Sequence, residues 1–288
     1  MRRIFAIRWI FVVLVVLVYP ATVSYATIIA FYSDGVIQKG DTYGKVDVYD
    51  TPPAHTTVDM TGGQVNKPGM FTYDATTVNI SGGYVNSLST YGSSIVNILG
   101  GSVCDYGSYL ISHDLSTVNL YEGGTLHGLS FGEFILQDSS VFNIYGGDAL
   151  LFVMPFDFGV VNVYNGYIYG GIEPHEYSTI NVYGGYIDVF GENILVPETA
   201  PVNIYGYGFD YEPEADWRYW DDPANGWWVS KLTGYGFNGT PIIYWGLPDP
   251  STHPNIRLIP EPTTVMFLLA GAMFLVRKNS KPRKNEGR

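Results

Sequence analysis

The acidic side chains are the groups in this sequence that come closest to catalytic chemistry. Hydrolysis of a glycosidic bond needs two carboxylates that converge on that bond. The acids of the central region fall at unequal separations along the chain: Asp105, Asp114, Glu133, Asp138, Asp148 and Asp188. Their spacing therefore selects no pair as general acid and base.

The histidines form no recognisable catalytic or metal-binding pattern. His113 and His127 are 14 residues apart, and His175 stands between Glu173 and Glu176. A helical zinc site needs two histidines four positions apart, which this segment does not offer. We therefore expect these histidines to be solvated loop residues, and we predict no metal ion at them.

The basic residues and the cysteine argue against further classes of site. A polysaccharide lyase needs a base, usually arginine or lysine, and Lys67 is the single cation of residues 58–209. The lone Cys104 rules out an intramolecular disulfide and any multi-cysteine zinc site. The sequence thus predicts a protein that is not an enzyme and has no resident cofactor. Calcium is the one ion that its carboxylates could hold.

The charge distribution excludes nucleic acid as a partner. The whole chain carries a net charge of −12, and within residues 27–259 only six lysines and arginines face 25 aspartates and glutamates. Such a surface repels a phosphate backbone. An acidic polysaccharide would need bridging cations to approach it.

A repeat of about twenty residues fills the middle of the chain and must position any site. Each unit has a three-residue core of an apolar residue, an asparagine (an aspartate in the first unit) and a second apolar residue. The eight cores are residues 58–60, 78–80, 96–98, 118–120, 142–144, 161–163, 180–182 and 202–204. A fixed period of this length indicates a repeat architecture.

The residue types decide which repeat architecture this is. Six of the eight units continue into a Gly-Gly pair, and the other two keep one glycine. Leucine-rich repeats need several leucines per unit, and a β-propeller blade needs about forty residues. We therefore predict an all-β fold, a parallel β-helix (β-solenoid) of about eight coils over residues 58–209, with coils ~4.8 Å apart.

Side-chain alternation orients each coil. The first and third core residues share one face, which we expect to be the interior, so the asparagine and the residue after the core point outward. Stacked coils would then form an amide ladder of Asn79, Asn97, Asn119, Asn143, Asn162, Asn181 and Asn203, beside a stripe of Tyr121, Tyr145, Tyr164, Tyr183 and Tyr205. Such ladders stabilise stacked strands, the interpretation we favour, although they could also form a platform for sugars.

The segments on either side of the repeats are expected to cover the open ends of the solenoid. Residues 27–57 would form an N-terminal cap or a degenerate first coil, and residues 210–259 a C-terminal cap with a β-hairpin around Asn238-Gly239. The C-terminal segment also concentrates five aromatic residues: Trp217, Tyr219, Trp220, Trp227 and Trp228. These aromatics either seal the end or bind a neutral sugar, with calcium as a second possible ligand of the acids between them.

The N-terminus has the pattern of a secretory signal peptide. Arg2 and Arg3 precede an apolar run at residues 9–19, which Pro20 ends, and Ala26 closes a small-residue cleavage site. This order is typical of residues that are removed on export. We therefore predict a signal peptide at residues 1–26 and passage through the secretion translocon.

The C-terminus resembles a known sorting signal. Pro260, Glu261 and Pro262 precede the uncharged residues 263–276, and Arg277 and Lys278 open a basic tail that would stop translocation. This order resembles the PEP-CTERM signal, here residues 260–288, with a single hydrophobic helix. The resemblance implies processing by an exosortase, a membrane protease of exopolysaccharide-producing Gram-negative bacteria.

These patterns predict an exported, surface-sorted solenoid. It would be held briefly in the inner membrane by its C-terminal helix and would then reside at the cell surface or in the extracellular matrix. We expect a structural or adhesive role, with exopolysaccharide as a partner. The alternative is a secreted polysaccharide lyase or glycoside hydrolase of the β-helix type.

Overall fold

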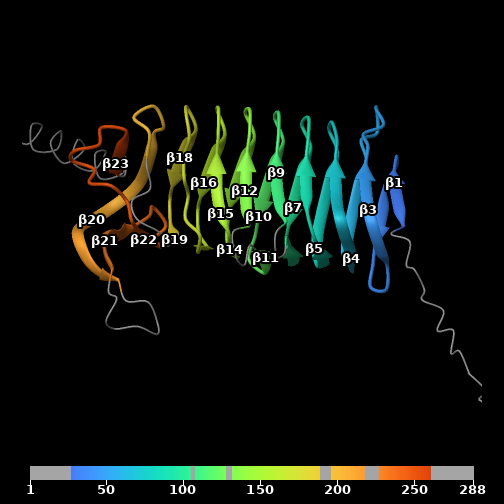
Figure 1. Ribbon diagram of the computed structural model, residues 1–288, viewed down its shortest axis with the longest axis horizontal. Helices are drawn as coiled ribbons and strands as arrows, with labels where there is room; N and C mark the ends of the chain where they lie inside the picture. The colour runs from blue at the N-terminus through green and yellow to red at the C-terminus, as the bar shows by residue number, and fades with distance from the viewer. Residues whose placement is uncertain (1–26, 105–107, 128–131, 189–195, 218–226, 261–288) are drawn as a thin grey trace, which may run out of the picture.

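The protein is built of stacked parallel coils. The computed structural model describes residues 27–104, 108–127, 132–188, 196–217 and 227–260, and these are all-β with no helix. They form a parallel β-solenoid of about seven turns, seen along its length in Figure 1. No segment of this part of the chain is a helix long and apolar enough to cross a membrane. The predicted signal peptide and C-terminal helix lie outside the described residues.

The first face of the solenoid carries the repeat cores. Seven consecutive pairings join the eight cores in register, so Asn79 lies opposite Asn97 and each later asparagine opposite the next. The predicted parallel stacking is confirmed. The strands of this face are β2 (Gly35–Ile37), the start of β4 (Thr57–Thr72), the start of β5 (Thr77–Val85), β7 (Ile95–Ile98), β10 (Thr117–Leu120), β13 (Val141–Ile144), β16 (Val160–Val163), β18 (Thr179–Val182), the start of β20 (Val202–Trp217) and β23 (Ile256–Pro260).

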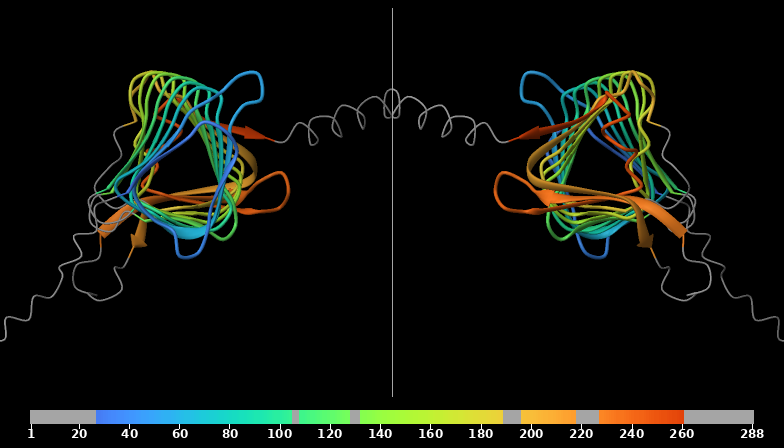
Figure 2. Two further views of the ribbon diagram at one scale, coloured as in Figure 1. Left: turned by 90° about the vertical axis from the view of Figure 1, so that its right-hand side faces the viewer. Right: turned by 90° about the vertical axis from the view of Figure 1, so that its left-hand side faces the viewer.

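Two more faces close each coil, and the view along the axis in Figure 2 has a roughly triangular outline. Strands β3 (Thr42–Val48), β4 and β5 bend around corners and contribute to more than one face. The second face contains β8 (Gly101–Val103), β11 (Gly124–His127), β14 (Asp148–Leu150), β17 (Tyr167–Ile168), β19 (Gly185–Ile187) and β22 (Pro241–Trp245). The third contains β1 (Ile28–Phe31), β6 (Leu88–Thr90), β9 (Tyr109–Ser112), β12 (Glu133–Leu136) and β15 (Phe152–Pro155).

The interior is filled by the apolar residues of the cores. The first and third residues of all eight cores are fully buried, as the alternation predicts. One corner of the interior instead holds small hydroxyl side chains that bond to one another. Thr90 donates to Ser112 over 2.9 Å, and Ser112 lies 2.7 Å from Ser116. These pairs satisfy hydroxyl groups that would otherwise be costly to bury.

The Gly-Gly pairs form the corner between the first and second faces. Gly83 has a φ of +89°, a conformation that favours glycine, and a Cβ there would lie 2.6 Å from the carbonyl carbon of Gly62. The equivalent Gly101 has a φ of +76° and the same close approach to the coil before it. The glycines therefore allow both the sharp turn and the contact between adjacent backbones.

The N-terminal segment contributes coil strands. Strand β2 pairs with the first repeat core, whereas residues 46–48 pair with β1 and with the last part of β4 on the third face. The first-face equivalent of the repeat core is therefore residues 35–37. The run Val46–Tyr49, in which the sequence suggests a degenerate first coil, therefore contributes its strand residues to the third face and not to the first.

The C-terminal segment covers the other end. After residue 206 strand β20 leaves the stack and forms an antiparallel meander with β21 (Trp227–Tyr235) and β22. The turn between β21 and β22 contains Asn238 and Gly239, as the hairpin pattern predicts. Leu232, Ile242 and Tyr244 of the meander are buried against the last coils.

Candidate functional site

A continuous amide ladder runs along the first face. Each asparagine donates from Nδ2 to Oδ1 of the asparagine one coil earlier, over 2.8 Å in the middle of the ladder. At one end Asn79 donates to the carboxylate of Asp59 over 2.8 Å. At the other end Asn203 donates to Asn181 over 2.9 Å. The side chains predicted to form a ladder thus bind mainly one another.

The tyrosine stripe beside it is also a stack. Neighbouring rings from Tyr121 through Tyr145, Tyr164 and Tyr183 to Tyr205 have centroids 4.6–5.1 Å apart and are nearly parallel. Partial burial and the neighbouring tyrosines raise the pKa of both Tyr164 and Tyr183. Because each inner ring has a ring on both faces, the faces that would stack on a pyranose are already covered. The geometry favours the structural interpretation of this stripe.

A second aromatic stack lies at the corner that follows the third face. Tyr32, Tyr49, Tyr73, Tyr91 and His113 stack with centroid distances of 4.8–5.4 Å. The sequence analysis missed it because it aligned the units on the first face. The signal was present, since each of these residues directly follows a strand of the third face.

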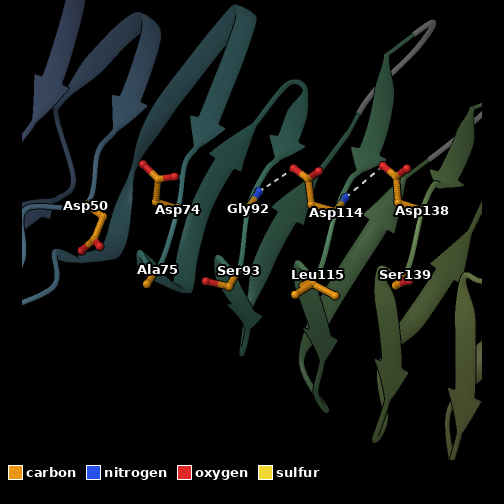
Figure 3. Close-up of a pocket in the computed structure, with 9 residues that line it drawn as sticks. All are labelled: Asp50, Asp74, Ala75, Gly92, Ser93, Asp114, Leu115, Asp138 and Ser139. Carbon is orange, nitrogen blue, oxygen red and sulfur yellow. Dashed lines mark hydrogen bonds between the residues drawn. The ribbon is translucent and has the colours of Figure 1, made fainter.

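A row of acids follows this second stack and lines a shallow depression of about 680 Å³ (Figure 3). The carboxylate of Asp114 accepts a hydrogen bond from the Gly92 backbone N–H over 2.8 Å. In the same way Asp138 accepts from the N–H of Asp114, and Asp157 from that of Asp138, each over 3.1 Å. Asp74, Asp114, Asp138 and Asp157 all have a φ between 52° and 59°. These carboxylates tie each corner to the preceding coil.

The acid row brings together two of the predicted catalytic candidates, Asp114 and Asp138. Residues one coil apart are separated by about 4.8 Å at the backbone, close to the carboxylate spacing of a retaining glycosidase. Glycosidase chemistry also needs contrasting surroundings that keep one carboxyl protonated and the other ionised. Asp114 and Asp138 instead share one environment, because each accepts a backbone N–H from the coil before it.

The remaining acid candidates do not join this row. Glu133 lies on the third face, Asp148 and Asp188 on or beside the second, and Asp105 outside the described residues. No group of three or more histidine, cysteine or acidic residues that could hold a metal ion occurs in the described ranges.

An aromatic patch that the sequence analysis missed lies near the C-terminal end of the second face. Tyr167 packs against Tyr186 with centroids 4.8 Å apart and planes 36° apart, and the indole N–H of Trp245 donates to the Tyr186 hydroxyl over 2.9 Å. The Lys231 ammonium lies 4.8 Å from the centroid of the Trp245 ring. These rings are tilted rather than stacked, and the Lys231 ammonium occupies one face of Trp245.

Asp188 lies within the same patch and is almost fully buried. Burial, followed by the charge of Asp188, raises the pKa of the Tyr167 hydroxyl, and the same two causes raise that of Tyr186. Both phenols therefore stay protonated, and the Tyr167 hydroxyl is itself hydrogen-bonded to Asp188. Tilted rings beside phenol donors are groups that recognise a sugar.

The aromatic cluster predicted from the sequence is only partly described. Trp217 pairs with Trp227, and Asp216 with Trp228, at the end of the antiparallel β20–β21 ribbon. Tyr219 and Trp220 lie outside the described residues. Of the sorting motif, Pro260 ends β23, and Glu261, Pro262, Arg277 and Lys278 lie beyond the described part, as does the predicted cleavage residue Ala26.

The amide ladder gives a testable prediction about stability. We expect Asn119→Leu to lower the free energy of unfolding by about 1–3 kcal/mol, because it leaves the neighbouring amides of Asn97 and Asn143 without their partner. Asn203→Leu is the matched control, since both residues are 9% exposed but Asn203 makes a single ladder bond. Chemical denaturation measures both. Equal losses in the two variants would show that the ladder is not the source of the effect.

Comparison with known proteins gives no match: no protein-family model, no curated protein sequence and no solved structure is detectably similar to this chain.

Proposed function

We propose that this protein is an exported structural or adhesive rod that is sorted to the cell surface and works in the extracellular polysaccharide matrix. The observation that carries the proposal is that the polar side chains on the outer surface form their hydrogen bonds with neighbouring coils of the same solenoid. The amides of the first face and the acids of the corner bond mainly to the adjacent coil. Side chains engaged in this way stabilise a rod and are not free to do chemistry.

Adhesion is assigned to the aromatic patch of Tyr167, Tyr186 and Trp245. Its rings are tilted rather than stacked, and the protonated Tyr186 hydroxyl, which accepts from Trp245, keeps its own proton for donation. The strongly acidic body disfavours an acidic polymer, so the partner is a neutral polysaccharide. This assignment replaces the tyrosine stripe of the first face as the sugar platform.

The alternative function is cleavage of polysaccharide by a β-helix hydrolase or lyase. The observation in its favour is the acid row, in which Asp114 and Asp138 line the shallow depression. The shared environment of these acids weighs against it. The hydrolase alternative requires that Asp138→Asn abolish release of reducing sugar from the host exopolysaccharide, whereas the rod proposal requires no such release from the parent protein.

Export and sorting are tested together in an exopolysaccharide-producing Gram-negative host that carries an exosortase. We expect the parent chain in the matrix fraction without its N- and C-terminal signals. Replacing Pro260, Glu261 and Pro262 with alanine should leave a longer precursor in the membrane fraction, because the protease would no longer recognise it. Immunoblots of the two fractions give the measurement.

The control for sorting is Pro248→Ala, which removes a proline from an ordered loop upstream of the motif. It should be processed like the parent. Equal processing and release of the triple-alanine variant would refute the sorting proposal. Equal retention of the parent on the cells of a host strain that makes no exopolysaccharide would refute the adhesive partner.

A further inference from the structure

The N-terminal end of the solenoid has open strand edges. Strand β1 is hydrogen-bonded to β3 and strand β2 to β4, and neither has a partner on its other side among the described residues. Strands that end a stack present unpaired N–H and C=O groups, which readily pair with a further strand. Natural proteins usually protect such edges with charges, prolines or covering segments.

The outward side chains of the two edge strands are apolar rather than charged. Ile28 is 69% exposed and Val36 is 57% exposed. Strands β1 and β2 contain no lysine and no proline, the residues that commonly block edge pairing. Phe31 is half-buried and packs on the core from this side, so the end is partly closed but keeps apolar surface.

Export leaves almost no chain to cover this end. Cleavage after Ala26 would leave Thr27 as the single residue before β1. This inference rests on that cleavage and on the proposed export. One residue cannot form a strand beside β1. A cover for the mature protein must therefore come from another molecule.

The opposite end of the solenoid differs. There the antiparallel meander of β20, β21 and β22 occupies the position of the next coil, and β22 pairs with β19 on the second face. A head-to-tail stack of copies would therefore meet an end of different shape. A head-to-head pair brings two identical open ends together, which is the arrangement of a closed two-fold dimer.

The charge distribution fits the same arrangement. The protein carries a net charge of −12, so side-by-side contact of two rods would bring many like charges together. Contact through the ends keeps the two acidic bodies far apart.

We propose that the mature protein forms a head-to-head dimer in which β1 pairs antiparallel with β1 of a second copy. Antiparallel pairing follows from the two-fold symmetry, because one strand edge meets the same edge reversed. The dimer pairs the open edge of β1 and continues the hydrogen-bonded stack across the interface. The result is a rod of double length with a C-terminal end at each tip.

The test uses protein exported by a Gram-negative host, solubilised in mild detergent, and checked by N-terminal sequencing. Sedimentation should give a dimer for the parent and a monomer for Ile28→Lys, since a lysine on the edge disfavours strand pairing. Leu115→Lys is the matched control, because Leu115 is 67% exposed but lies far along the solenoid. This control should remain dimeric.

A cross-link locates the contact. Ala30→Cys should form a disulfide-linked dimer on mild oxidation, because a two-fold axis at residue 30 sets the two copies of this residue directly opposite each other, within disulfide reach. The native Cys104 does not compete, since it is buried and its pKa is raised to about 12 by burial. Leu115→Cys should not cross-link.

The outcomes separate this inference from the proposed export. A cleaved chain that sediments as a monomer overturns the dimer and leaves export intact. A chain that keeps residues 1–26 contradicts the export on which the dimer rests. Dimers of Ile28→Lys as stable as those of the parent, or equal cross-linking of Leu115→Cys, would also overturn it.

Discussion

Replacing Ile144 with aspartate is expected to unfold the solenoid. Ile144 is fully buried and lies between Leu120 of the preceding coil and Val163 of the next. A carboxylate there would have no partner, and burying an unpaired charge costs more than a domain of ordinary stability tolerates. We expect a loss of more than about 4 kcal/mol in the free energy of unfolding, measured by urea denaturation and by the β-sheet signal in circular dichroism.

The control for this change is Leu115→Asp at an exposed corner. Leu115 is 67% exposed, so its replacement should change the unfolding free energy by less than about 0.5 kcal/mol. Val182→Asp should repeat the Ile144 result, because Val182 is the equivalent buried residue two coils later. Wild-type stability of either buried variant would contradict the solenoid interior.

Replacing Gly83 with alanine is expected to give the second large loss. The new Cβ would lie 2.6 Å from the carbonyl carbon of Gly62 and 2.7 Å from the carbonyl oxygen of Gly63, and φ is +89°. These contacts involve the backbone of the adjacent coil, so relief requires the two coils to separate. We expect a loss of about 2–4 kcal/mol, measured by thermal melting and urea denaturation.

Gly239→Ala separates the two causes of that loss. Gly239 has a similar φ of +79°, but a Cβ there would meet nothing within 4 Å. Its replacement should cost only the strain of the left-handed conformation, about 1 kcal/mol. If the two alanine variants have the same melting temperature, the close contact between coils does not explain why the Gly-Gly pairs are glycine.

The repeat cores could be read from the sequence because their period and their alternation agree. Eight copies of the same three-residue pattern predicted that Val78 and Ile80 point inward and Asn79 outward, and the structure confirms this. The amide ladder followed because stacking in register brings identical residues together. The number of turns is close to the predicted eight coils, with the difference at the end where β20 leaves the stack.

The features that the sequence did not reveal belong to the corners. Thr90 and Ser112 are polar residues that suggest a surface, yet they are buried and bond to each other. Their burial depends on which coil lies next to them, and a single unit does not show that. The acid row did carry a periodic signal that the alignment of the cores left unused, because Asp114 and Asp138, like Asp74 and Asp157, lie four residues before the first core residue of their units.

The candidate site was harder to predict than the fold. The patch of Tyr167, Tyr186 and Trp245 joins two repeat units to a strand that returns from the C-terminal meander. Trp245 follows Tyr186 by 59 residues in the chain, yet the two side chains are hydrogen-bonded. A contact between residues of a repeat unit and a residue outside the repeats leaves no periodic pattern in the sequence. Only the three-dimensional structure therefore shows the patch.

The amide ladder also gives the rod an electrical direction. Every Nδ2 in it donates toward the N-terminal end, so the side-chain dipoles add rather than cancel, as peptide dipoles do in a helix. The carboxylate of Asp59 stands at the positive end of this array, and the register places Arg257 beside Asn203 at the negative end. A negative charge thus lies at the positive end of the array and a positive charge at its negative end. A coil inserted with its asparagine would lengthen the array without disturbing it, whereas a coil lacking that amide would split it into two shorter dipoles with unmatched poles facing each other.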